Sequence, residues 1–173
     1  MNEVLNCLET RRSVRKYLPK QIADAELNAI LEAGIYAPTA MGRQSPKIVV
    51  LQKPEDVAEL ERMNAAVLGN PDSHPFYGAP TVLVVLADAK AGTAVEDGSL
   101  VLGNLMNAAH ALGVGSCWIH RAREEFASGE GKALLKLWGI EGDWVGVGHC
   151  ILGYAAEPAA PAKPRKADYI VRV

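Results

Sequence analysis

Hydrophobic positions along the chain follow two spacings, one typical of helices and one typical of buried strands. Between residues 24 and 35, apolar side chains recur three and four positions apart, which predicts a buried helix with Asp24 as its N-cap. The run TVLVVLA (81–87) is apolar throughout, as in a strand covered on both faces. The same patterns predict helices over residues 2–10, 54–67, about 95–112 and 130–138, and strands over 47–52, 115–119 and 144–154.

Two further features indicate contact with another surface. The helix expected at 95–112 contains Gly98 and Gly103, which lower helix propensity and suggest that something packs very close, such as a partner chain. The proline-rich segment 155–166 predicts a stiff, extended spacer, and YIVRV (169–173) after it has the pattern of an edge strand. We therefore expect this tail to lie across a surface.

The composition indicates one globular domain, 1–173. Of the 173 residues, 49% are hydrophobic and 22% charged, a mix that can bury a sizeable core. The net charge of −2 excludes the basic field of a general nucleic-acid or membrane-surface binder. The longest apolar run, 79–87, is shorter than the roughly 20 residues of a membrane span, and the N-terminus lacks the order of a signal peptide, so we expect a cytoplasmic protein.

The familiar cofactor and metal motifs are missing from the sequence. No GxGxxG stands between a strand and a helix, and there is no phosphate loop, GxSxG or HExxH. Cys7, Cys117 and Cys150 are far apart and are expected to be reduced core thiols. The four histidines lack ligand spacing, so no metal is expected, and we interpret His110 and His149 as hydrogen-bonded core or interface residues.

A local cationic cluster, RRSVRKY (11–17), is the strongest chemical signal. Three interpretations are open: cations at a helix end, an arm that contacts nucleic acid, or a site for one compact phosphate. The absence of a broader basic face weakens the nucleic-acid arm. Lys163 and Arg165 in the tail are spaced to point the same way in an extended segment, which favours the phosphate site.

In this context the chain resembles the FMN-dependent nitroreductases, in particular the small members without long helical insertions. The resemblance covers nearly the whole chain and rests on five segments in matching order. They are RRSVRKY, YAPTAMGRQSP after the second helix, FYGAPTVLVV leading into the second strand, ALGVGSCWI before the third, and GYAAEPAAPAKPRK in the tail.

The resemblance implies an α+β fold, with a mixed central sheet flanked by helices, built as an intertwined homodimer with two flavins at its interface. The tail, 155–173, is expected to cross the partner subunit. Residues implied to bind the FMN phosphate and the polar edge of the flavin are Arg11, Arg12, Ser13, Arg15, Lys163 and Arg165. Residues implied to line the isoalloxazine from the partner are Pro38, Thr39, Ala40, Met41 and Gln44. Those implied to meet the flavin ring are Ser116, Cys117, Trp118 and Ile119 through the backbone, and Asn64 at the pyrimidine edge.

The implied activity is an NAD(P)H-dependent FMN oxidoreductase that reduces nitroaromatic, quinone or similar small-molecule acceptors by ping-pong hydride transfer. The flavin N5 carries the chemistry, so no side chain is expected to be catalytic, and Arg15 is expected near the N1 edge. Gly42 departs from the asparagine of many members. The alternatives are a flavin carrier or sensor without turnover, or another chemistry such as dehydrogenation or dehalogenation. The loop 69–78 is interpreted as an ordinary connection or as a rim of the acceptor site.

Overall fold

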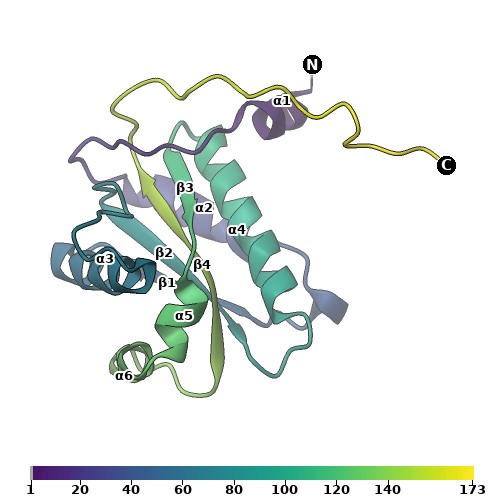
Figure 1. The fold of residues 1–173 in the computed structure, drawn as a ribbon. Helices are drawn as coiled ribbons and strands as arrows, with labels where there is room; N and C mark the ends of the chain where they lie inside the picture. Colours follow the sequence, from purple (N-terminus) through teal and green to yellow (C-terminus); the bar gives the residue numbers. More distant parts are fainter. Residues whose placement is uncertain (1) are drawn as a thin grey trace.

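The computed structural model describes residues 2–173 and shows an α+β fold (Figure 1), as expected. Each predicted helix and strand, except the edge strand expected at 169–173, is present within one to two residues of its expected ends. The helices are α1 (Glu3–Thr10), α2 (Asp24–Ile35), α3 (Pro54–Leu68), α4 (Ala94–Ala111), α5 (Ala122–Ala127) and α6 (Gly129–Leu137), with a short 3₁₀ turn η1 (Ala40–Gly42). The strands are β1 (Pro46–Leu51), β2 (Thr81–Asp88), β3 (Gly115–Ile119) and β4 (Trp144–Gly153).

The four strands form one sheet in the order β1-β2-β4-β3. All pairings between them are antiparallel, so the expected mixed character is limited to one parallel bridge, between Ser13 and Ser116 at the outer edge of β3. Strand β2 lies inside the sheet and is buried on both faces, which explains its uninterrupted apolar sequence. Strands β1 and β3 are the two edge strands, and no other strand of the described chain pairs with the outer edge of either.

Helices cover both faces of the sheet (Figure 1). On one face, α2 and α4 pack with side chains such as Ile30 and Leu105 against Leu83 and Cys150 of the sheet. On the other face, α3, α5 and α6 bury a second cluster around Leu86. The alternation along β2 sends neighbouring residues to opposite layers, so one strand serves both cores.

Three local predictions were wrong or incomplete. Asp24 lies inside α2, so the N-cap is Ala23 rather than Asp24. The Ala23 amide donates to the Glu26 carboxylate at 2.9 Å. Helix α5 was not predicted, since it has only six residues and a weak apolar stripe. Residues 169–173 form no strand within the chain; they lie exposed beyond the body of the molecule.

The two glycines of α4 have different surroundings. A Cβ at Gly98 would lie 2.5 Å from Val147 Cγ2, so the close packing there comes from β4 of the same chain rather than from a partner. A Cβ at Gly103 would meet no atom within 4 Å. Only Gly103 therefore leaves room for another surface on α4.

Candidate functional site

The segment RRSVRKY runs from the end of α1 along the outer edge of β3. Ser13 forms the parallel bridge to Ser116, and the Val14 amide donates to the Ser116 carbonyl at 2.9 Å. The Tyr17 hydroxyl donates to the Val14 carbonyl at 2.8 Å, and burial raises the pKa of that phenol. This backbone pairing holds the cationic segment against β3.

The three arginines of the segment have different roles in the structure. Arg12 Nη1 donates to the carbonyls of Glu9 and Arg11 at 2.8 and 2.7 Å, so the helix-end interpretation holds for Arg12. Arg11 Nη1 is buried and has no hydrogen-bond partner within the described chain. Arg15 lies exposed. Arg11 thus carries a buried donor that no group of the described chain accepts.

A second buried polar atom without a partner lies on the neighbouring strand. The Oγ atom of Ser116 is buried, 2% of the residue is exposed, and no hydrogen bond reaches this oxygen within residues 2–173. Native structures satisfy the large majority of buried polar groups, so such atoms are unusual. The other two within residues 2–173, Glu125 Oε1 and His149 Nδ1, belong to a buried pair that joins α5 to β4. A guanidinium and a hydroxyl are the donors that suit phosphate, so Arg11 and Ser116 fit the phosphate of FMN.

His110 lies beside the same segment, in the last turn of α4. Its Nε2 lies 2.9 Å from Thr10 Oγ1. Burial lowers the pKa of His110, and the charges of Arg11 and Arg12 lower it further. The expectation of a hydrogen-bonded histidine is confirmed here.

The rest of β3 presents backbone rather than reactive side chains. Cys117 is buried, and its thiol donates to the Trp118 carbonyl at 3.6 Å. Ile119 is buried and Trp118 is half-buried. Beyond the bridge at Ser116, no strand of the described chain pairs with the outer edge of β3, so backbone groups there can bind a ring.

Asn64 lies close to the end of β3, but its side-chain amide is already hydrogen-bonded within the chain. Its side chain is fully buried; Nδ2 donates to the His120 carbonyl at 2.8 Å and Oδ1 accepts from Arg121 Nε at 2.9 Å. A contact between Asn64 and the flavin therefore stays a prediction, and it requires the amide to turn away from these partners.

The segment 38–44 lies at the opposite end of α4 from the cationic segment. The Ala40 amide donates to the Asp97 carboxylate in the first turn of α4, whereas Arg11 lies near His110 in the last turn. At 1.5 Å per residue, Asp97 and His110 are about 20 Å apart. Met41 and Gln44 expose their side chains at this far end. One chain therefore does not bring the two sets of predicted flavin residues together.

The tail begins beside the cationic segment and then leaves it. Tyr17 forms an antiparallel bridge with Ala155, and Lys16 forms an ion pair with Glu157 at 3.0 Å. Further along, Lys163 and Arg165 are exposed, with no ion pair within the described residues. The structure therefore does not place these two cations at Arg11.

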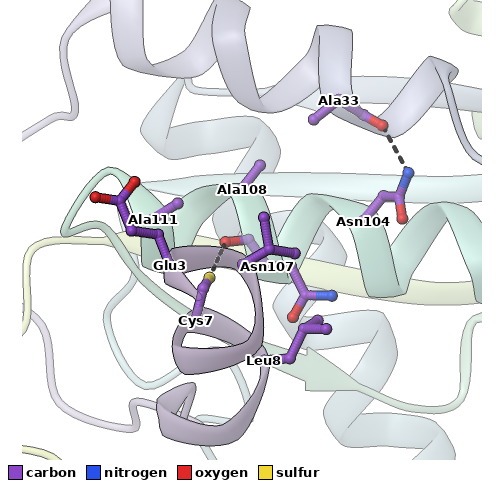
Figure 2. A pocket seen from close by; sticks show the side chains of 9 residues that line it. Glu3, Cys7, Leu8, Ala33, Asn104, Asn107, Ala108 and Ala111 are labelled. Atoms are coloured by element: carbon purple, nitrogen blue, oxygen red, sulfur yellow. Dashed lines mark hydrogen bonds between the residues drawn. The ribbon is translucent and has the colours of Figure 1, made fainter. Parts of the chain in front are cut away.

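An apolar groove of about 480 Å³ lies between α1, α2 and α4 (Figure 2). The Cys7 thiol donates to the Asn107 carbonyl at 3.4 Å at its floor, and Asn104 Nδ2 donates to the Ala33 carbonyl at 2.9 Å. Beside it, the apolar face of α1 is exposed: Val4 is 66% and Leu8 51% accessible. This face of the chain is too apolar for a surface that only meets water.

Other site types have less support. Among residues 2–173 no group of three or more His, Cys, Asp or Glu could hold a metal ion. None of the described helices is long and apolar enough to cross a bilayer. All three cysteines are free thiols, and burial raises the pKa of Cys150.

Two buried polar contacts, one at the loop 38–45 and one in the core, were missed by the sequence analysis. Asp97 receives two hydrogen bonds from residues more than fifty positions upstream, a contact without any local signal. The pair formed by Glu125 and His149, 2.5 Å apart and both buried, joins α5 to β4. His149 was expected in the core, but nothing in the sequence identified the glutamate as its partner.

Comparisons with known proteins identify the family. The model of the Nitroreductase family matches residues 8–77 and 70–154. An Archaeoglobus fulgidus protein described as an NADH dehydrogenase/NAD(P)H nitroreductase is 34% identical over 160 residues, 89% of this chain and 86% of its own. The crystal structure of a Bacteroides fragilis nitroreductase with bound FMN matches with a TM-score of 0.91 and 34% identity, covering 100% of both chains. A Desulfitobacterium hafniense nitroreductase with bound FMN gives 0.89 and 29%, covering 100% of this chain and 99% of its own. This chain belongs to the nitroreductase family.

Proposed function

We propose that this protein is an FMN-dependent oxidoreductase that uses NAD(P)H to reduce small-molecule acceptors. The observation that carries the proposal is the pair of buried, unpartnered donors, Arg11 Nη1 and Ser116 Oγ, on two segments joined by the bridge at Ser13. The two similar nitroreductase structures contain FMN, and the Archaeoglobus relative is named for NAD(P)H. Both facts support the same cofactor and reductant here.

The phosphate end of FMN is proposed to lie at the start of β3. Arg11 and Ser116 would donate hydrogen bonds that nothing else in the chain receives. Arg12 and Ser13 would add donors from the same segment, although Arg12 also holds the end of α1. Proposed further contacts at this end are Arg15, Lys163 and Arg165.

The ring of the flavin is proposed to be covered by a second copy of the chain. The segment with Pro38, Thr39, Ala40, Met41 and Gln44 contacts Asp97, whereas Thr10, next to Arg11, contacts His110, about 20 Å further along α4. A homodimer is therefore the simplest way to bring both segments onto one ligand. The exposed apolar face of α1 and the open side of Gly103 supply a surface for such a partner.

The tail is proposed to belong to this dimer. Beyond Glu157, which pairs with Lys16, the tail extends away from the cationic segment, and its last residues are apolar and exposed, with Ile170 77% and Val171 80% accessible. In a dimer this segment would cross the partner, and 1–173 would form one domain per subunit. Such a crossing would also bring Lys163 and Arg165 to a phosphate at the interface.

When bound, FMN supplies the redox chemistry, taking a hydride from NAD(P)H and passing two electrons to an oxidised acceptor such as a quinone or nitroaromatic. The chain's own task is to hold and orient. Backbone groups of Ser116–Ile119 on the outer edge of β3 would orient the ring, and the Arg15 cation would favour negative charge on it. Cys117 takes no part, because its thiol is buried and donates to a carbonyl. A cytoplasmic location is proposed with this use of NAD(P)H.

The experiment is steady-state oxidation of NADH and NADPH by protein loaded with FMN, with menadione or a nitroaromatic as acceptor. Turnover that depends on both FMN and the acceptor supports the proposal. Protein that binds FMN tightly but gives no turnover with either nucleotide contradicts the oxidoreductase and leaves a flavin carrier. Protein that binds no FMN contradicts the proposal as a whole.

A further inference from the structure

The carboxylate of Asp97 is buried in the first turn of α4, and the residue is 3% exposed. Oδ1 accepts the Ala40 amide at 3.0 Å, and Oδ2 accepts the Ser45 hydroxyl at 2.8 Å and the Thr93 hydroxyl at 3.2 Å. Two of these three donors belong to the loop between α2 and β1. A charge buried in this way is stable only with such partners.

The loop that Asp97 holds has a strained backbone. Met41 and Gln44 have φ values of 52°, and Gly42 has a φ of 65°. A left-handed conformation is uncommon outside glycine, and it persists where the surroundings impose it. The two hydrogen bonds to Asp97 lie on either side of these residues, at Ala40 and Ser45. The buried carboxylate therefore fixes both ends of the strained turn.

The side chains of the turn point away from this anchor. Met41 is 79% accessible, and Gln44 is exposed. An anchored backbone with free side chains is the arrangement expected of a loop that contacts a ligand or partner.

We infer that Asp97 is a positioning residue, which holds the loop of residues 38–45 in the strained shape that covers the flavin bound to the partner subunit. This inference rests on the proposed function. It assigns to Asp97 no contact with flavin or substrate; its effect passes through the backbone of the loop.

The ionised carboxylate is the form that accepts these three hydrogen bonds most strongly. Burial raises the pKa of Asp97, but the bonds from Ala40, Ser45 and Thr93 outweigh burial and lower it below its usual value. At neutral pH the anchor is therefore charged, and its charge also lies at the favourable N-terminal end of α4.

The competing explanation is that Asp97 only stabilises the start of α4. Thr93 separates the two roles, because its hydroxyl bonds Asp97 without touching the loop, whereas Ser45 bonds Asp97 from the loop itself. The variants are therefore D97A, S45A and T93V, with D97N as the conservative replacement that keeps an acceptor for Ala40.

The first measurement is hydrogen exchange of the peptide spanning 38–46 in the full chain at neutral pH. D97A is expected to speed exchange of this peptide by roughly tenfold or more and S45A by less. D97N keeps the acceptor for Ala40 but loses the carboxylate oxygen that accepts Ser45, so it should resemble S45A, while T93V stays near wild type. The second measurement is KM and kcat with FMN, NADH and menadione. D97A is expected to lower kcat/KM by roughly tenfold, within the about 100-fold that a 1 Å misplacement can cost.

The outcomes separate the two proposals. If T93V opens the loop as much as S45A does, or if D97A changes exchange only in the first turns of α4, the positioning role is overturned and the proposed function stands. If wild-type protein binds no FMN, the proposed function is overturned, whereas loop opening confined to D97A, D97N and S45A still supports Asp97 as the anchor of the loop.

Discussion

The two ends of α4 carry two kinds of polar site. At its C-terminal end, beside Arg11 and Ser116, buried donors have no partner within the described chain. At its N-terminal end, the buried carboxylate of Asp97 accepts three hydrogen bonds, and nearby side chains such as Met41 are exposed. The first end is built to receive hydrogen-bond acceptors, and the second to hold a shape. A ligand with a phosphate at one end and a flat ring at the other needs both.

The largest expected effect tests whether the two ends meet through a partner. Gly103→Arg places a large cation on the open side of α4, where no atom of the chain lies within 4 Å. We expect wild-type protein to have twice the 18.5 kDa chain mass by light scattering, and the variant to have the mass of one chain and to lose FMN. Gly129→Arg is the matched control, since that glycine is equally open but begins α6 on the other face of the sheet. A dimeric, flavin-loaded Gly103→Arg protein would contradict the composite site.

The second effect separates the free cation from the occupied one. Arg11→Ala removes charge-assisted bonds to phosphate, each worth about 1.5–3 kcal/mol, and should weaken FMN binding about 10- to 100-fold in a fluorescence titration. Arg12→Ala should weaken it less, because the Arg12 guanidinium already bonds two carbonyls, and should also destabilise α1. Arg123→Ala, an exposed arginine of α5, controls for net charge. Equal losses in Arg11→Ala and Arg123→Ala would remove Arg11 from the site.

The third effect compares one serine at each end. Ser116→Ala removes a buried hydroxyl without a partner, so it should raise the free energy of unfolding by about 1 kcal/mol yet weaken FMN binding about fivefold. Ser45→Ala removes a bond to Asp97 and should lower the free energy of unfolding by about 1.5 kcal/mol, with little change in FMN affinity. Urea unfolding of the flavin-free proteins measures both. The comparison fails if the two variants change stability in the same direction.

The smallest effect is the pH dependence of the Asp97 end. The folded-state pKa of Asp97 is lowered, so its carboxylate stabilises the fold fully above its unfolded pKa, near 3.8, and this stabilisation is lost as the pH falls through the folded value. The difference in unfolding free energy between wild type and Asp97→Asn should be constant above about pH 5 and shrink below about pH 4. A difference that stays constant down to pH 3 would argue against the ionised anchor.

The sequence predicted the regular parts of the fold because local pattern determines them. The unbroken apolar run of β2 and the stripe of α2 identified both elements, since one is buried on two faces and the other on one. Helix α5 escaped because its burial depends on Phe126 and Glu125, whose partners come from β4 and other distant segments. The edge strand expected at 169–173 is not formed within one chain, and the sequence pattern cannot say which chain supplies its neighbour.

The candidate site shows the same division. The cationic segment was recognised from its composition, but which arginine is free depends on tertiary contacts: Arg12 bonds carbonyls at the end of α1, and Arg11 does not. Asp97 could not be recognised, because Ala40 and Ser45 reach it only after α2 and α4 have packed together. Hydrogen bonds between distant segments are the part of a site that sequence patterns describe least.

The most direct test of the composite site is a heterodimer of two differently tagged variants. Arg11→Ala breaks the phosphate end, and Thr39→Arg blocks the loop that covers the ring. Pairing one variant with the other should restore about half of the wild-type FMN sites and turnover, because one of the two sites receives both intact ends. Pairing the double variant with wild type should restore neither, since each site then contains one broken end. The opposite result, with intact sites only in the second pairing, would show that one chain holds the whole flavin and would contradict the account.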